Sequence, residues 1–213
     1  MKHEPHALPI KEPVAYQLYC DLHHDSTGSI CISQIQEGKC KDHYGRYQAM
    51  LDYMQSLENQ AKIFFSINTF EEFIRSTEHI CELKALYIDL DFHKNTNTTR
   101  EQILDGINLS IKDGKIPKPT HIIDSGYEIN LIWRIKRATA QDLPLWQTVE
   151  QYLCEQLKHL GADSKVLNGT KIFPVRSTNK ITIMDSSQSE YDLRLLYHTI
   201  TQCEPYSNSL PSQ

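Results

Sequence analysis

The chain has 213 residues, of which 39% are hydrophobic, and this is enough to bury the core of one generous domain or two small ones. Its formal net charge of −5 argues against a protein that coats nucleic acid non-specifically, because such proteins carry an overall basic balance. The sequence has neither the apolar run of a signal peptide nor the roughly 20 apolar residues that cross a bilayer, so we expect a cytoplasmic protein that makes no membrane contact.

Composition along the chain predicts one domain with irregular ends. Residues 1–15 contain three prolines among scattered charges and are expected to form an irregular arm. Residues 204–213 are rich in serine, proline and asparagine and are expected to form a flexible tail. Residues 16–203 are left as a single domain. The six cysteines are scattered without a Cys-x-x-Cys pair, so we interpret them as reduced thiols rather than zinc ligands.

The first half of this domain alternates between helical and extended patterns. Residues 44–59 place Tyr47, Met50 and Met54 on one helical face, and residues 62–70 open as an aromatic and β-branched strand. Asn68 and Thr69 are expected to cap a further helix, because two glutamates follow in its first turn. The apolar residues 85–91 then predict a short strand that ends in two acids.

The second half continues the same mixture of elements. Residues 100–112 form an amphipathic pattern that stops before Gly114 and Pro117, and residues 143–160 form a longer helical pattern that stops at Gly161. Four further segments have strand character, at 120–124, 129–135, 172–175 and 181–184. The predicted fold class is therefore α+β, with a mostly antiparallel sheet flanked by helices.

Two aspartates, Asp89 and Asp91, end the predicted strand at 85–91. Residues two apart in a strand point to the same face, so their carboxylates should lie only a few ångströms from each other. Such like charges need a cation, and Mg²⁺ or Mn²⁺ prefers oxygen ligands of this kind. The pair therefore indicates a divalent metal site that handles nucleotides. The same sequence pattern also fits an edge strand with two solvated acids at a turn.

Three more segments follow the aspartate pair in a fixed order. A Ser-Gly turn, Ser125 and Gly126, joins two predicted strands and is followed by Asn130 and a tryptophan. A Gly-Ala-Asp segment ends in Asp163, for which Asp124 and Asp185 are rival acids. A basic segment at 170–180 contains Arg176 and Lys180, whose guanidinium and ammonium groups both suit phosphate.

This ordered series, over residues 62–182, resembles the archaeo-eukaryotic primase (AEP) superfamily. More narrowly, it is similar to the replication primases and primase-polymerases encoded on plasmids, phages and integrated elements. The resemblance implies an RRM-like catalytic core in which Asp89, Asp91 and Asp163 hold two metal ions, Mg²⁺ or Mn²⁺. It also implies that the incoming nucleoside triphosphate is positioned by a set of polar and basic residues, namely Ser125, Gly126, Asn130, Arg176 and Lys180.

The resemblance further implies a nucleotidyltransferase that synthesises primers on a single-stranded DNA template during replication of a plasmid or mobile element. Because the sequence contains no GxxxxGK[ST] motif, unwinding would fall to a separate replicative helicase. Asn130 departs from the family pattern, in which many members place a histidine. An amide can donate a hydrogen bond to phosphate but supplies no positive charge, so affinity or activity would be reduced.

Two alternatives belong to other functional classes. Residues 22–25 read Leu-His-His-Asp and are reminiscent of the metal-binding histidines of rolling-circle initiators, which are nucleases. However, adjacent histidines face opposite ways in an extended chain, so this pattern equally fits an exposed polar turn. The second alternative is a catalytically degenerate primase-like domain that binds DNA, for which Asn130 and the irregular spacing around Arg176 would be signs of decay.

Overall fold

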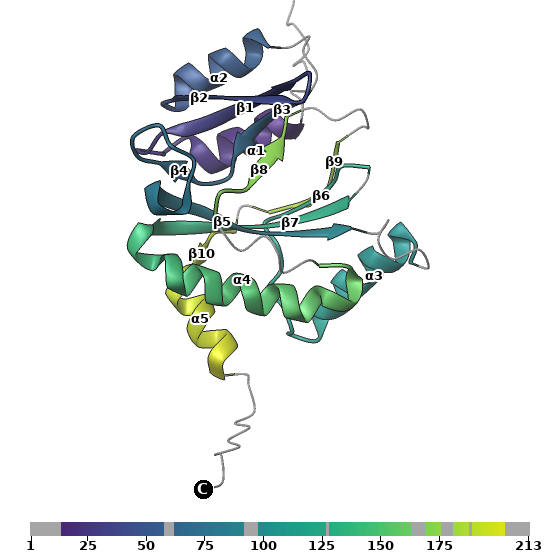
Figure 1. Cartoon of the computed structure of the whole chain (residues 1–213). Helices are drawn as coiled ribbons and strands as arrows, with labels where there is room; N and C mark the ends of the chain where they lie inside the picture. The colour runs from purple at the N-terminus through teal and green to yellow at the C-terminus, as the bar shows by residue number, and fades with distance from the viewer. Residues whose placement is uncertain are drawn as a thin grey trace, which may run out of the picture.

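The computed structural model describes residues 14–57, 62–91, 98–126, 128–162, 169–175, 181–187 and 189–202. Within these ranges the chain forms a smaller and a larger β-sheet, which lie one above the other with helices outside and between them (Figure 1). The α+β class predicted from the sequence is confirmed. Among the described residues, no helix is long and apolar enough to cross a membrane.

The smaller sheet has the strand order β2-β1-β3-β8, and every neighbouring pair is antiparallel. Its strands are β1 (Ile30–Gln36), β2 (Lys39–Gly45), β3 (Ile63–Ser66) and β8 (Ile172–Pro174). Helices α1 (Val14–His23) and α2 (Tyr47–Ser56) pack on it and share its apolar core. Because β8 comes from far along the chain, this sheet closes only when both halves of the sequence meet.

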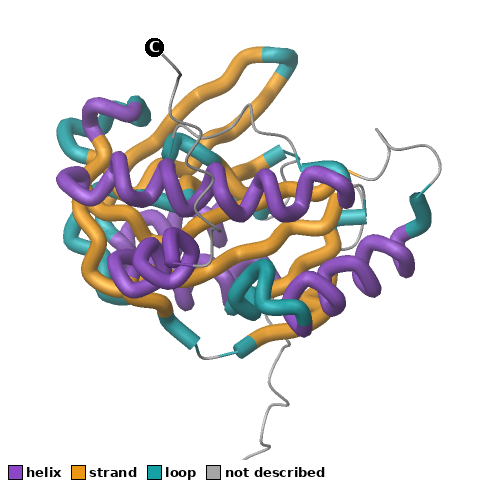
Figure 2. The backbone as a smooth tube through the Cα atoms, turned by 90° about the horizontal axis from the view of Figure 1, so that it is seen from below, coloured by secondary structure: helices purple, strands orange, loops and turns teal. Residues whose placement is uncertain are grey.

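The larger sheet has the order β4-β5-β7-β6-β9 and is antiparallel along that path, while β10 pairs parallel with β7. Its strands are β4 (Thr69–Phe70), β5 (Ile80–Asp91), β6 (His121–Asp124), β7 (Glu128–Thr139), β9 (Thr182–Ser186) and β10 (Tyr191–Asp192). Helices α3 (Arg100–Lys112), α4 (Leu143–Leu157) and α5 (Leu193–Gln202) cover the face that turns away from the smaller sheet (Figures 1 and 2).

Strand β5 separates the two apolar cores. Its even-numbered residues from Leu86 to Leu90 pack with the helices α3 and α4. Ala85 and Tyr87 pack instead with α1 and the smaller sheet. Side chains two apart in a strand share a face, so the odd-numbered residues from Ala85 to Asp91 point into the space between the two sheets. The register shift between Leu83 and Ala85 reverses this alternation earlier in β5, where Leu83 packs in the other core.

Helix α4 covers the open edge of β5 beyond its short pairing with β4. The Trp146 indole Nε1 donates to the Ala85 carbonyl at 3.0 Å, and Glu150 Oε1 accepts from the Tyr87 amide at 2.9 Å. Trp146 and Glu150 are four residues apart and therefore lie one above the other on the helix. They satisfy backbone groups that a neighbouring strand would otherwise bond.

Several predicted elements are confirmed. Helix α3 spans the predicted residues, and Thr99 forms a capping box with Gln102 at its start. The two strands around residues 120–135 pair as the predicted hairpin, and α4 is followed by a short 3₁₀ helix, Lys158–Leu160, before Gly161 turns left-handed at φ +99°. The first predicted helix begins later than expected, at Tyr47, because the preceding residues extend β2.

The predicted helix after Asn68 is wrong. Thr69 and Phe70 form β4 against β5, and the chain then turns, with positive φ at Glu72 (52°) and Phe73 (57°), into a short 3₁₀ helix at Thr77–His79. Asn68 caps no helix, because its side chain bonds two distant backbone groups instead. Helical spacing in this segment was a local pattern that strand pairing overrode.

Candidate active site

Asp89 and Asp91 lie where the sequence predicted, at the end of β5 and on the same face of the strand. In the ladder with β7, Asp89 is opposite Asn130 and Asp91 is opposite Glu128. Both aspartates belong to the odd-numbered set that faces the space between the sheets, and both are half-buried. The pair is therefore a feature of the inter-sheet space and not of an outer surface.

A lysine that the sequence analysis did not select completes this arrangement. The Lys171 Nζ forms an ion pair with Asp89 Oδ2, and both side chains are 21% exposed. The same ammonium lies 4.9 Å from the centroid of the Tyr87 ring, a cation–π contact. Lys171 immediately precedes β8, so this ion pair joins the two sheets. The sequence pattern indicates the basic segment that contains Lys171, but within it the pattern favours Arg176 and Lys180.

Asn68 anchors the backbone that leads to Lys171. Its Nδ2 donates to the Gly169 carbonyl at 2.9 Å, and its Oδ1 accepts from the Lys84 amide at 2.8 Å. The side chain is buried, at 1% exposure. Asn68 therefore ties the segment before β8 to the edge of β5.

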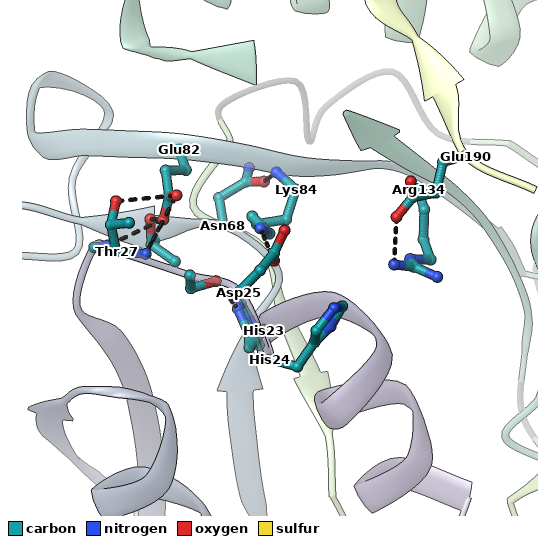
Figure 3. A network of polar contacts seen from close by, with 12 residues as sticks. His23, His24, Asp25, Thr27, Asn68, Glu82, Lys84, Arg134 and Glu190 are labelled. Carbon is teal, nitrogen blue, oxygen red and sulfur yellow. Dashed lines mark hydrogen bonds and ion pairs between the residues drawn. The ribbon is translucent and has the colours of Figure 1, made fainter. Parts of the chain in front are cut away.

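Figure 3 shows Asn68 and Lys84 within a wider polar network on the inter-sheet side. Glu82 accepts hydrogen bonds from the turn after α1 and from the Thr69 hydroxyl. Burial alone would raise the pKa of Glu82, but these hydrogen bonds stabilise the carboxylate and the pKa is lowered. Beside it, Lys84 pairs with Asp25 at 2.7 Å. A cavity of about 480 Å³ is lined by that pair and by a second ion pair, Arg134–Glu190. In the second pair, Arg134 Nη2 lies 2.5 Å from Glu190 Oε1. These ion pairs lie at the opposite end of β5 from Asp91.

The Ser-Gly turn is a tight, internally bonded hairpin. Gly126 adopts φ +86°, which favours glycine, and its amide donates to Asp124 Oδ1 at 2.7 Å. The Ser125 hydroxyl donates to the Glu128 carbonyl at 3.1 Å. Ser125 is 5% exposed, so its hydroxyl currently serves the turn.

Asn130 is fully buried beside the aspartate pair. The Tyr87 hydroxyl donates to its Oδ1, and its Nδ2 has no hydrogen-bond partner within the described part of the chain. Burial raises the pKa of Tyr87 well above its ordinary value, so this hydroxyl remains a donor. The amide NH₂ of Asn130 is thus the group with free hydrogen-bonding capacity at this position.

The two rival acids have cationic partners of their own. Asp124 is 4% exposed and forms an ion pair with Arg100 at the start of α3. Asp185 pairs with Lys118 at 2.9 Å. Among the described residues, neither aspartate joins Asp89 and Asp91 in a group of three potential metal ligands.

Asp163, Arg176 and Lys180 lie outside the described residues, so their predicted roles stay predictions. The chain on the near side of Asp163 is placed, however. Ala162 forms a bridge with Leu90, and the Asp91 amide donates to the Gly161 carbonyl at 3.4 Å. The backbone therefore runs alongside the end of β5 immediately before Asp163.

The residues present fit a divalent metal in part. Asp89 Oδ1 is buried and has no hydrogen-bond partner within the described ranges, which leaves a carboxylate oxygen available for a cation. Asp91 supplies a second hard oxygen donor on the same face, as Mg²⁺ or Mn²⁺ requires. The described residues contain no group of three acids, histidines or cysteines that could hold a metal, so a complete site needs a ligand beyond them.

The histidine pair does not form the site of a rolling-circle nuclease. His23 is fully buried at the end of α1, with Nε2 bonded to the Ser66 carbonyl at 2.8 Å and Nδ1 bonded to the Ser26 hydroxyl at 3.2 Å. Both ring nitrogens are therefore used. Only His24 lies in the exposed polar turn expected for this segment. The position of His23 was missed because α1 was not predicted.

Comparisons with known proteins decide what fold carries these residues. No family model matches the chain. The structure is similar to the AEP domain of the primase-polymerase of cyanophage S-2L, with a TM-score of 0.62 and 14% identity over 87% of this chain and 96% of that one. It is also similar to the catalytic domain of primase RepB′ in complex with initiator DNA, with a TM-score of 0.55 and 8% identity over 88% of this chain and 94% of that one.

The chain has the AEP primase-polymerase fold. This finding confirms the fold that the resemblance implied. In sequence, the chain is 36% identical over 194 residues to a "Replication protein" of Clostridium perfringens, a match that covers 87% of this chain. It spans about half of that relative, 47% of its length. The AEP fold thus places Asp89, Asp91, Asn130 and Lys171 together between its two sheets.

Proposed function

We propose that the chain is the catalytic domain of a replication primase that joins nucleotides on a single-stranded DNA template, for a plasmid or another mobile element. One observation carries this proposal. In an AEP fold, Asp89 and Asp91 share one face between the sheets, and a buried Asp89 oxygen is free to bind a cation. The sequence relative named as a replication protein supports the biological setting.

In this proposal Asp89, Asp91 and Asp163 hold two Mg²⁺ or Mn²⁺ ions. Bound there, divalent ions would neutralise triphosphate charge and activate the attacking 3′-hydroxyl. The protein's own contribution is to fix two carboxylates on one strand, in register with Asn130 of β7. The free amide of Asn130 would then donate to a phosphate oxygen, while Ser125 and Gly126 would shape the turn beside it.

The remaining phosphate contacts would come from the basic segment, through Arg176 and Lys180. The template would be single-stranded DNA, as the resemblance to replication primases implies, and DNA binding is supported by the similar RepB′ domain, which was determined in complex with initiator DNA. A net charge of −5 confines such binding to local basic groups, which makes it sensitive to salt. A separate helicase would supply the unwound strand.

Primer synthesis tests the proposal directly. Labelled nucleotides, single-stranded DNA and Mg²⁺ or Mn²⁺ are supplied to the wild type, to Asp89→Asn and to Asp91→Asn. Asparagine keeps the size of the side chain and removes the charge that the metal needs. The matched control is Asp105→Asn, because Asp105 is an exposed acid on α3. We expect synthesis in the wild type and the control and background levels in the two site variants.

A second candidate function is favoured by the state of Asn130. It replaces a histidine that the family often carries, and its carbonyl is occupied by Tyr87. A catalytically degenerate domain that binds DNA would have such a site. DNA binding that ignores metal and triphosphate, together with no synthesis by the wild type, would support this candidate and overturn the primase.

A further inference from the structure

Lys171 forms an ion pair with Asp89, the carboxylate that the proposed metal would need. Its ammonium is paired with Asp89 Oδ2, so one of the two Asp89 oxygens is already neutralised, while Oδ1 remains without a partner. The ammonium is held in this position by the Tyr87 ring face, and its backbone is held through Gly169 by Asn68. An incoming cation therefore meets a competing positive charge that is fixed by the fold.

The competing charge is placed so that it can move. Lys171 is 21% exposed, and a lysine side chain has a flexible four-carbon stem that can carry its ammonium several ångströms. A cation–π contact and a partly exposed ion pair are each modest interactions, so a stronger anion can draw the ammonium away. A nucleoside triphosphate arriving between the sheets is such an anion.

We propose that Lys171 is a counter-ion to Asp89 that couples metal binding to nucleotide binding. Without nucleotide, Lys171 holds Asp89 and weakens the site for a divalent metal. With nucleotide, the ammonium transfers to the triphosphate, and Asp89 becomes fully available to the metal. The inference rests on the proposed function, because it takes Asp89 as a metal ligand and a triphosphate as the second ligand.

Thermodynamic linkage makes this coupling measurable from either side. If triphosphate raises the affinity for metal by displacing Lys171, then metal raises the affinity for triphosphate by the same factor. Removing the ammonium should have two opposite effects. It should strengthen metal binding to the protein alone, and it should weaken the enhancement that triphosphate produces.

The experiment measures Mn²⁺ binding by paramagnetic resonance, first with the protein alone and then with a deoxynucleoside triphosphate but no template, so that no synthesis occurs. Protein-free mixtures of Mn²⁺ and triphosphate supply the background. The variants are Lys171→Met, which keeps an unbranched chain against the Tyr87 ring, and Lys171→Arg, which keeps the charge. Lys115→Met is the matched control, because Lys115 is an exposed lysine paired with Asp113.

We expect Lys171→Met to bind Mn²⁺ roughly fivefold or more tightly in the absence of nucleotide, a factor at the low end of ordinary coupling between two sites. The enhancement by triphosphate should shrink by a similar factor. Lys171→Arg and Lys115→Met should resemble the wild type in both measurements. Unchanged or weaker Mn²⁺ binding by folded Lys171→Met, including no binding by either protein, overturns the inference.

Asp89→Asn separates this inference from the proposed function. If Asp89→Asn loses Mn²⁺ binding and primer synthesis while Lys171→Met binds Mn²⁺ like the wild type, the counter-ion role fails and the primase stands. If Lys171→Met binds Mn²⁺ more tightly but the wild type synthesises no primer, the counter-ion role stands and the primase fails.

Discussion

Glu150 of α4 accepts a hydrogen bond from the Tyr87 amide at 2.9 Å, on the open edge of the strand that carries Asp89 and Asp91. The Glu150 side chain is 2% exposed, and its Oε2 has no partner within the described residues. Burial raises the pKa of this carboxyl well above its ordinary value of 4.5. A buried acid thus supports the backbone that leads to the candidate metal ligands.

The raised pKa predicts how stability depends on pH at this position. The folded state retains a proton that the unfolded state releases above about pH 4.5, so the contribution of Glu150 to stability is present below that pH and is lost as pH rises. Glu150→Gln keeps an acceptor for the Tyr87 amide and removes the titration. Its free energy of unfolding should therefore fall less with rising pH than that of the wild type, as measured by urea unfolding at several pH values.

Glu150→Ala is the contrasting variant. It leaves the Tyr87 amide buried without a partner, which costs about 1–3 kcal/mol. We expect it to be less stable than Glu150→Gln at every pH. Equal stability of the two variants would show that the hydrogen bond to Tyr87 contributes little.

The buried imidazole of His23 should make stability depend on pH in the opposite direction. Burial lowers its pKa from 6.5 to about 4, so between these values the unfolded state binds a proton that the folded state excludes. Stability should fall as pH falls from 6.5 towards 4, by on the order of 3 kcal/mol in total. His23→Gln, which can still donate to the Ser66 carbonyl, should have a smaller loss over this range. The measurement is urea unfolding of both proteins, and parallel pH curves would contradict the prediction.

Gly161 lies against the backbone of Asp91. A Cβ at this position would come within 2.9 Å of the Asp91 carbonyl oxygen, and φ is +99°. Gly161→Ala should therefore destabilise the fold by about 1–3 kcal/mol and displace the end of β5. Primer synthesis and Mn²⁺ binding should both decline, because Asp91 moves with its backbone.

Gly114→Ala is the control for backbone strain alone. Gly114 also has a positive φ, +70°, but a Cβ there would meet nothing within 4 Å. It should lose stability without losing Mn²⁺ affinity. If both alanine variants bind Mn²⁺ equally well, the contact between Gly161 and Asp91 has no bearing on the site.

Replacing the buried Asn68 by alanine should destabilise the fold, whereas the same replacement at an exposed asparagine should not. Asn68→Ala leaves the Lys84 amide and the Gly169 carbonyl without their buried partner, at about 1–3 kcal/mol for each group. Asn108→Ala, at an exposed position on α3, should be neutral or slightly stabilising because alanine favours helix. Thermal unfolding compares the two variants with the wild type. Hydrogen exchange at the Lys84 amide should accelerate only in Asn68→Ala.

Much of the fold and the first part of the candidate site could be predicted from the sequence, because they depend on short-range patterns. The apolar run at 85–91 identified the second half of β5, and the two-residue repeat of a strand placed Asp89 and Asp91 on one face. Helical spacing, with Gly114 and Pro117 beyond its end, identified α3 from its first residue to its last. The Ser-Gly pair identified the hairpin between β6 and β7. Each of these features is set by residues within a few positions of each other.

Tertiary structure alone decided the partners of those residues. Lys171 reaches Asp89 across 82 positions of sequence, and Glu150 reaches the Tyr87 amide across 63. Asn68 was expected to cap a helix, yet its side chain bonds Gly169, 101 positions away. These contacts arise when β8 joins the smaller sheet and α4 packs against the edge of β5, and no local periodicity encodes such a meeting. The sequence by itself determined which strand carries the acids, whereas the packing of distant segments determined which charge lies against them.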